Sequence, residues 1–191
     1  MSGHSKWAQI KYKKATTDAK KGKIFSKLSR LITIAAKELG PDSKTNSRLA
    51  AAIEEAHRAN MPSDNIDRAV KKASAKESAE LKEVVYEAYG PGGSALLITA
   101  VTDNSNRTTN EIRHLLSGHG AKLGEQGSAM WAFSKPARPA GGEGKEFIAK
   151  YPVSLSSEDS KKFEALLSAL DDHDDVQEVY SNADLPAGGQ E

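Results

Sequence analysis

The spacing of apolar residues changes once along this chain, near Ala79, and that change limits the folds open to it. Before this point apolar residues recur three and four positions apart, as in Ile24, Leu28 and Leu31, which is the period of an amphipathic helix. After it, short apolar runs of strand length alternate with further helical patterns. The sequence therefore predicts an all-helical N-terminal part followed by a mixed α+β part.

Breaker residues divide the first part into three short helices. Gly40-Pro41 ends a helix that starts near Ile24, and Met61-Pro62 ends a second helix that starts near Thr45. Ser63 is expected to cap a third helix. Each helix has one apolar face, so together they predict a small three-helix bundle that follows a basic arm.

The second part reads as strands, turns and helices in irregular alternation. Residues 90–93 predict a hairpin turn, and Thr108 with Glu111 has the capping-box spacing that predicts the start of a helix. Residues 128–133 are expected to form a strand. This order predicts a ferredoxin-like α+β domain with a mostly antiparallel sheet.

A stretch rich in proline and glycine, KPARPAGGEGK at residues 135–145, offers no core positions and predicts a linker. We therefore expect a basic arm and helical bundle in residues 1–78. The α+β domain is expected to combine residues 79–134 with residues 146–185 and to close across the linker. The last residues, 186–191, are expected to be a loose tail.

Charge divides at nearly the same place as the apolar spacing. Residues 1–76 carry 17 Lys and Arg against 7 Asp and Glu, whereas residues 77–191 carry 10 against 19, so the near-neutral total hides a net of +10 and a net of −9. Within residues 1–30 there are nine basic residues and one acid, Asp18. Such asymmetry indicates a polyanion, above all nucleic acid, as the partner of the basic half. A solvated basic face that aids solubility is the alternative.

Several classes of protein do not fit the composition. The chain has no cysteine, which excludes disulfides and cysteine-ligated metal sites and suits a reducing cytoplasm. It has no run of eighteen apolar residues, so no membrane span is expected. The N-terminus lacks the apolar core of a signal peptide, so we expect no cleaved leader and a cytoplasmic location.

Catalytic and metal-binding patterns are weak. None of the five histidines has a zinc spacing with a second ligand, and the acidic cluster within residues 171–175 is interpreted as a solvated turn. Glu87, Glu111 and Glu125 could serve as general acids, yet the sequence pairs none of them. We therefore expect no enzyme, no catalytic residue, no metal, no cofactor and no small-molecule substrate.

The candidate nucleic-acid-binding residues are the lysines of the arm, the aromatic residues among them, and the first basic residues of the first helix. Lysine ammonium groups neutralise phosphates, and aromatic rings stack on exposed bases. For Trp7, packing onto the bundle is an equal alternative. The candidates are Lys6, Trp7, Lys11, Tyr12, Lys13, Lys14, Lys20, Lys21, Lys23, Lys27 and Arg30.

Several segments resemble the YebC/PmpR family, in the order the family has them, and together they cover most of the chain. They are residues 1–11 (MSGHSKWAQIK), 18–28 (DAKKGKIFSKL), 60–62 with 65–66, 86–93 (YEAYGPGG), 102–108 (TDNSNRT), 124–133 and 174–180 (DDVQEVY). The resemblance implies a helical N-terminal domain followed by α+β domains. Family members usually carry a third domain where this chain has residues 135–145, so we expect that domain to be missing here.

The resemblance also implies a function. Members of the family are described as DNA-binding transcriptional regulators, and they include a mitochondrial translational activator and ribosome-associated factors. No enzymatic activity comes with the family. Promoter DNA and ribosomal RNA on the ribosome thus remain two open targets, because both are bound by lysine–phosphate contacts. A third hypothesis is a protein–protein adaptor whose acidic α+β domain is the working surface.

Overall fold

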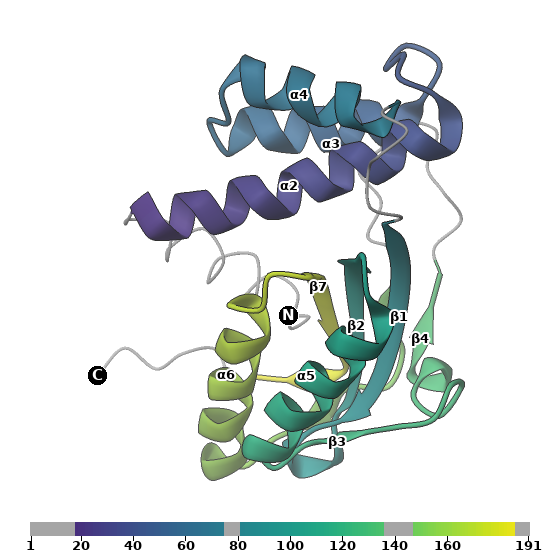
Figure 1. Cartoon of the computed structure of the whole chain (residues 1–191). Coiled ribbons are helices and arrows are strands. Elements are labelled where there is room, and N and C mark those ends of the chain that lie inside the picture. The colour runs from purple at the N-terminus through teal and green to yellow at the C-terminus, as the bar shows by residue number, and fades with distance from the viewer. Residues whose placement is uncertain (1–17, 75–80, 136–146, 186–191) are drawn as a thin grey trace.

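The computed structural model describes residues 18–74, 81–135 and 147–185, and it arranges them in two tiers (Figure 1). Three helices form the first tier: α2 (Asp18–Leu39), α3 (Ser47–Arg58) and α4 (Ser63–Ala73). A sheet with two helices forms the second tier. The prediction of a helical part followed by an α+β part with a mostly antiparallel sheet is confirmed.

The three helices share one apolar core, to which α2 contributes Leu28, Ile32 and Ala35 and α3 contributes Leu49 and Ala52. All five are at most 5% exposed. Their spacing of three and four is the spacing that predicted the helices, because side chains at these positions lie on one face. Helix α2 is longer than predicted, since it begins at Asp18 rather than near Ile24.

The turn between α2 and α3 is closed by one fully buried side chain. The Oδ1 atom of Asn46 accepts a hydrogen bond from the backbone nitrogen of Leu49 at 3.0 Å and caps α3. Its Nδ2 atom donates to the carbonyl oxygens of Ala35 and Gly40, at 2.7 and 2.8 Å. The prediction that Ser63 caps α4 is wrong: Pro62 occupies the cap position and offers no side-chain hydrogen bond.

Four strands form the main sheet, in the order β3-β1-β2-β7 with every neighbouring pair antiparallel. Strands β1 (Lys82–Tyr89) and β2 (Ala95–Thr102) are the predicted hairpin, joined by a tight turn in which Gly92 and Gly93 have φ of 67° and 75°. That left-handed conformation favours glycine. The two outer strands are β3 (Lys122–Leu123) and β7 (Val176–Ser181).

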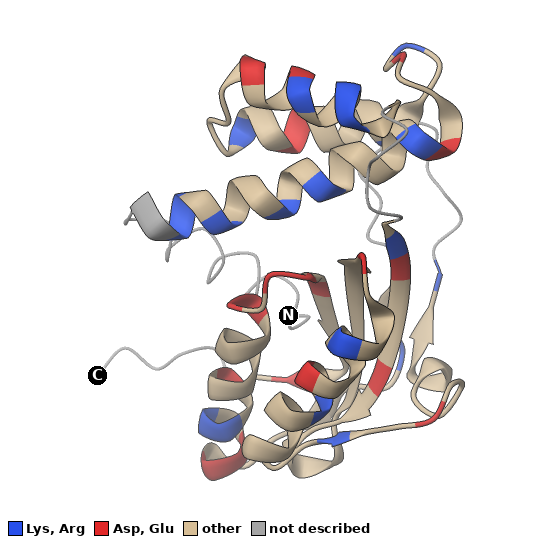
Figure 2. Cartoon of the chain, in the orientation of Figure 1, with Lys and Arg blue, Asp and Glu red and all other residues tan. Residues whose placement is uncertain are grey.

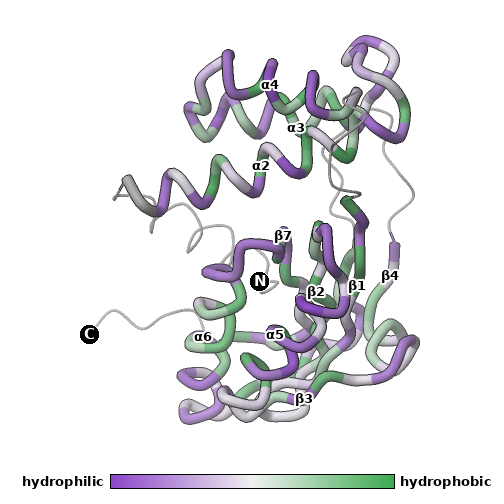
Figure 3. Tube along the Cα trace, viewed as in Figure 1, coloured by the Kyte–Doolittle hydropathy of each residue, from purple (hydrophilic) through white to green (hydrophobic). Residues whose placement is uncertain are grey.

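The sheet is covered on both faces, and hydrophobic residues gather along it in Figure 3. Helices α5 (Ser105–Gly118) and α6 (Ser157–Asp171) pack on the face that carries Leu96 and Ile98. Leu97 points to the opposite face, into a smaller cluster with Phe133, Phe147 and Tyr180. Strand β2 is therefore buried from both sides, which explains its almost continuous apolar sequence.

Short strands complete the second tier. Strand β4 (Phe133–Ser134) pairs antiparallel with β5 (Ile148–Ala149), and the predicted linker lies between them in the sequence. Strand β6 (Val153–Ser154) pairs with β8 (Ala183–Asp184) in parallel. Among the described helices, none has the length and apolar character needed to cross a membrane.

Two predictions about the second part are wrong. Helix α5 begins at Ser105, capped by the side chain of Asn104, so Thr108 lies inside the helix and is not its cap. Residues 128–133 do not form a strand; Met130–Ala132 is one turn of 3-10 helix, and only Phe133 begins a short strand.

Candidate nucleic-acid interface

The predicted nucleic-acid-binding residues fall into two groups. Five lie on α2, which Figure 2 shows as a helix with recurrent basic residues. Lys20 and Lys21 are exposed in its first turns. The other six lie outside the described residues; they are Lys6, Trp7, Lys11, Tyr12, Lys13 and Lys14.

Three of the five residues on α2 face the protein's own carboxylates. Figure 2 shows an acidic corner directly below the helix, where α6 ends and the chain turns into β7; its members are Asp171, Asp172, Asp174 and Asp175. The ammonium of Lys23 lies 3.0 Å from the carbonyl oxygen of Asp172. The side chain of Lys27 is only 8% exposed, and its ammonium lies 3.5 Å from the carboxylate of Asp171.

Arg30 makes the most enclosed contact with the acidic corner. Its guanidinium bonds to the carboxylate of Asp175, whose side chain is 3% exposed, and also to the carbonyl oxygen of Asp174 at 3.2 Å. The same carboxylate accepts hydrogen bonds from Thr108 Oγ1 at 2.6 Å and from Arg107 Nη2 at 2.8 Å. Asp175 therefore joins α2 to α5 and β7, and the interpretation of this cluster as a solvated turn is wrong for Asp175, although Asp172 and Asp174 are exposed.

These contacts change how Lys23, Lys27 and Arg30 are understood. In the described arrangement all three contact the second tier, although only Lys27 is nearly buried: the side chain of Lys23 stays 47% exposed and that of Arg30 28% exposed. A phosphate would reach Lys27 only if the two tiers separated, and at Lys23 and Arg30 it would compete with the protein's own acceptors, so their part in binding nucleic acid stays a prediction. Arg48 of α3 makes a further link, because its guanidinium bonds both to Glu38 of α2 and to Glu83 of β1.

Electrostatics favour the ionised form of Asp175. Burial alone would raise its pKa, but hydrogen bonds from Thr108, Arg107 and Arg30, together with the charge of Arg30, lower the pKa from 3.8 to about 2. The hydrogen bond to Asp175 correspondingly raises the pKa of Arg107 above its ordinary value. The corner is thus a charge-assisted network that persists at neutral pH.

Acid is expected to weaken the fold through this carboxylate. Because the pKa of Asp175 is lower in the folded state, its contribution is fully present above about pH 4 and is lost as the pH falls through about 2. A shift of this size corresponds to about 2 kcal/mol. Urea unfolding measures how much more stable the wild type is than Asp175→Asn. This difference in the free energy of unfolding should be about 2 kcal/mol smaller at pH ~2 than at pH ~6. A difference that stays constant across this range would contradict the assigned role.

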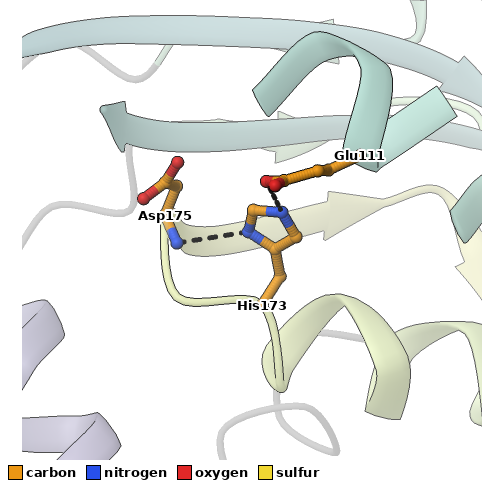
Figure 4. A group of neighbouring side chains, drawn as sticks. All are labelled: Glu111, His173 and Asp175. Atoms are coloured by element: carbon orange, nitrogen blue, oxygen red, sulfur yellow. Dashed lines mark hydrogen bonds and ion pairs between the residues drawn. The ribbon is translucent and has the colours of Figure 1, made fainter. Parts of the chain in front are cut away.

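One group near this corner has the residue types of a metal site. Ligand atoms of Glu111, His173 and Asp175 all lie within 4.8 Å of one another (Figure 4). However, His173 Nε2 lies 3.1 Å from Glu111 Oε2, and its Nδ1 accepts the backbone N–H of Asp175 at 3.2 Å. Both carboxylate oxygens of Asp175 already bind Arg30, Arg107 and Thr108, so a cation would sit beside two guanidinium groups. The geometry favours a hydrogen-bonded network over a metal centre.

A solvent-open groove lies between α2 and α4 and has a volume of about 530 Å³. Two cationic side chains of α4, Arg68 and Lys72, line it together with Arg30 from α2. Hydroxyl and amide groups of Ser26, Ser29 and Asn65 also line it, while Asp103 is its acidic member. Apart from Arg30, whose guanidinium already binds Asp175, these donors suit phosphate oxygens as hydrogen-bond acceptors.

Arg68 and Lys72 are not among the residues predicted from the sequence, although both lie in residues 1–76, which carry the excess of positive charge. They are four residues apart on the polar face of α4, and both are exposed. Their helical spacing was the available signal. Their place beside α2 depends on tertiary packing, including the hydrogen bond from Thr33 Oγ1 to the carbonyl oxygen of Ala69 at 3.0 Å.

Glu87, which the sequence left without a partner, is a structural anchor. Its carboxylate is buried and accepts hydrogen bonds from the backbone nitrogens of Gly127, Ala129 and Met130, at 2.6, 2.6 and 2.8 Å. Three amide donors satisfy a buried carboxylate that would otherwise be costly. Glu87 thus fixes the segment before Trp131, and Glu111 is held by His173 and Arg107.

Comparisons with known proteins identify relatives over nearly the whole chain. A probable transcriptional regulatory protein of Pseudothermotoga lettingae is 40% identical, with 97% of this chain and 94% of the relative aligned. One of Thermosipho melanesiensis is 42% identical with the same coverage. The crystal structure of a conserved hypothetical protein from Aquifex aeolicus superposes with a TM-score of 0.80 at 34% identity, over 92% of this chain and 95% of that one.

The family models match both tiers. The TACO1/YebC protein N-terminal domain matches residues 5–76, and the model of the TACO1/YebC second and third domain matches residues 81–138 and 142–183. The second model is matched in two segments, and the break between them, at residues 139–141, falls inside the predicted linker. The alignment with the Pseudothermotoga relative spans 239 positions, more than the 191 residues of this chain, so that relative has residues without a counterpart here. The chain belongs to the TACO1/YebC family.

Proposed function

We propose that this protein is a non-enzymatic regulator of gene expression that binds nucleic acid through its N-terminal basic part. The observation that carries the proposal is the concentration of charge, a net of +10 in residues 1–76. The groove between α2 and α4 adds Arg68 and Lys72 to the exposed Lys20 and Lys21 at the start of α2. Cations concentrated in one part of the chain attract a polyphosphate and release its counterions.

Two targets fit this surface, and the relatives favour one of them. Relatives are named probable transcriptional regulatory proteins, which supports a DNA target such as a promoter. The chain carries no sequence signature of a groove-reading helix, which suits contacts to phosphates more than to base edges. Ribosomal RNA bound on the ribosome, with translation as the regulated step, is the second candidate because it offers the same phosphates.

Two other classes are less well supported. An adaptor would use its acidic surface for a partner protein, but Asp171 and Asp175 already bind Lys27 and Arg30 within the chain. An enzyme would need converging reactive groups in a deep pocket. Among the described residues Glu87 and Glu111 instead hold backbone amides and neighbouring side chains. The proposal involves no cofactor and no small-molecule substrate, and it places the protein in the cytoplasm.

The pairing of strands on either side of the linker also supports a division into domains. We propose a bundle with its arm in residues 1–78, and an α+β domain that combines residues 79–134 and 146–185. The pairing of β4 with β5, on either side of the linker, supports closure across residues 135–145. We further propose that the family's third domain is missing at this linker.

Crosslinking in cells, followed by sequencing of both bound DNA and bound RNA, separates the two targets. A transcriptional regulator is expected to enrich defined promoter regions, and a translational one to enrich ribosomal RNA. The control is the chain with Lys13, Lys14, Lys20 and Lys21 changed to Glu, which should lose either signal. Equal recovery of both nucleic acids by the wild type and the control variant would count against the proposed function.

A further inference from the structure

Two large aromatic side chains stand exposed side by side on the second tier. Trp131 is 55% exposed and Tyr151 is 57% exposed. Their ring centroids are 5.8 Å apart with an interplanar angle of 32°, so they form one continuous aromatic surface. Neither ring belongs to the three apolar cores of the described residues.

The backbone beneath this surface is held firmly. The indole nitrogen of Trp131 donates to the hydroxyl of Tyr89 at 3.4 Å, and that hydroxyl in turn bonds to the carbonyl oxygen of Ser128. Glu87 fixes the preceding turn, as described above. The backbone nitrogen of Lys150, next to Tyr151, donates to the carbonyl oxygen of Ala132 at 2.9 Å. The two rings are therefore displayed by a tied backbone and not by a loose loop.

Exposed aromatic surface of this kind indicates a binding site, because a soluble protein gains by burying such rings. Charge indicates which ligand. Lys150 and Lys135 are exposed, and the ammonium of Lys135 lies 5.4 Å from the ring centre of Phe147, the residue before strand β5. These two lysines belong to residues 77–191, whose net charge is −9. A nucleic acid matches both the aromatic surface and the lysines, because it has planar bases and negatively charged phosphates.

We propose that Trp131 and Tyr151 form a stacking platform for unpaired nucleic-acid bases, with Lys135 and Lys150 placed to meet the adjoining phosphates. Bases stack on aromatic side chains with little dependence on sequence, whereas a duplex keeps its bases inside. This inference rests on the proposed function and deepens it. The basic bundle contacts phosphates of any strand, and the platform favours single-stranded segments.

The test compares a single-stranded oligonucleotide of about twelve nucleotides with a duplex of the same length, a size within the range of about 4–16 nucleotides that single-strand-binding domains cover. Trp131→Ala should weaken single-strand binding about tenfold, the equivalent of one stacked base. Duplex binding should stay within about twofold. Trp131→Phe should retain most of the affinity because it keeps a ring. Ile148→Ala, which removes a 44% exposed apolar side chain from β5, is the matched control and should change neither affinity.

Fluorescence gives a second readout that does not depend on affinity. The chain has two tryptophans, so Trp7→Phe leaves Trp131 as the only indole. Stacking of a base should quench this emission when the single strand is added, and the duplex should quench it much less. Melting temperatures of all variants check that each is folded.

Each remaining outcome decides against the platform. Unchanged single-strand affinity in Trp131→Ala, with no quenching, would overturn it while leaving the proposed function intact. A loss of affinity that accompanies conversion of a dimer to a monomer, measured by light scattering, would assign the rings to contact with a second copy. If the wild type bound neither oligonucleotide, the proposed function itself would fail.

Discussion

Replacing Asp175 with Ala is expected to lower the free energy of unfolding by about 3–5 kcal/mol. The carboxylate is nearly fully buried and receives Arg30, Arg107 and Thr108, which come from α2 and α5. Its removal leaves those donors without their shared acceptor and places two guanidinium groups beside each other. Urea unfolding followed by circular dichroism measures the change.

Asp174→Ala is the matched control for this prediction. It removes one negative charge at the adjacent position, but Asp174 is exposed and the contact it makes to Arg30 uses its backbone oxygen. Its free energy of unfolding should stay within about 0.5 kcal/mol of the wild type. If the two variants lost equal stability, local net charge would explain the effect and the buried network would not.

Changing Lys13, Lys14, Lys20 and Lys21 to Glu is expected to weaken binding to both duplex DNA and a ribosomal RNA fragment by roughly a hundredfold or more. Each Lys–phosphate contact adds to affinity through counterion release, and each reversal adds repulsion as well. Lys20 and Lys21 are exposed, so we expect the fold to survive their replacement. Fluorescence anisotropy with labelled nucleic acid measures the dissociation constants.

The control for charge reversal uses four exposed lysines of the second tier, Lys82, Lys122, Lys161 and Lys162, changed to Glu. It alters net charge by the same amount at a different place. Affinity should fall only a few-fold, since exposed charges farther away than a Debye length of ~10 Å are largely screened. An equal loss in both variants would mean that total charge, and not the N-terminal part, drives binding.

Local patterns predicted the helices well, because the helical period is visible in any short stretch. Ile24, Leu28 and Leu31 were placed on one apolar face by spacing alone; Leu28 is buried, and Ile24 and Leu31 pack against the core of the bundle. Local capping rules failed for α5, where two residues could each cap the start of the helix. Thr108 has capping-box spacing with Glu111, yet Asn104 caps the helix, because the Thr108 hydroxyl binds Asp175 instead.

Contacts between distant residues could not be read from the sequence. Arg30 and Asp175 are 145 positions apart in the sequence. Glu87 binds the backbone amide of Ala129, which is 42 positions away. Residues 128–133 look like a strand because they are apolar and aromatic, but the carboxylate of Glu87 draws this segment into a turn. The same turn brings Trp131 beside Tyr151, which no local pattern indicates.

The candidate interface was predictable only in part for the same reason. Charge counting located the basic half, but periodicity began the helix near Ile24 and left Lys20 and Lys21 in the arm, whereas both lie on α2. Charge counting could not separate them from Lys27, which points into the acidic corner and is nearly buried. That distinction depends on how α2 packs against the end of α6, a matter of tertiary structure.

The salt dependence of binding tests the central claim most directly. If about six lysines meet phosphates, the logarithm of the association constant for duplex DNA should fall against the logarithm of salt concentration with a slope near −5. The variant with four reversed lysines should show a much shallower slope. An association constant for the wild type that does not change with salt would contradict docking of a polyphosphate on the N-terminal part.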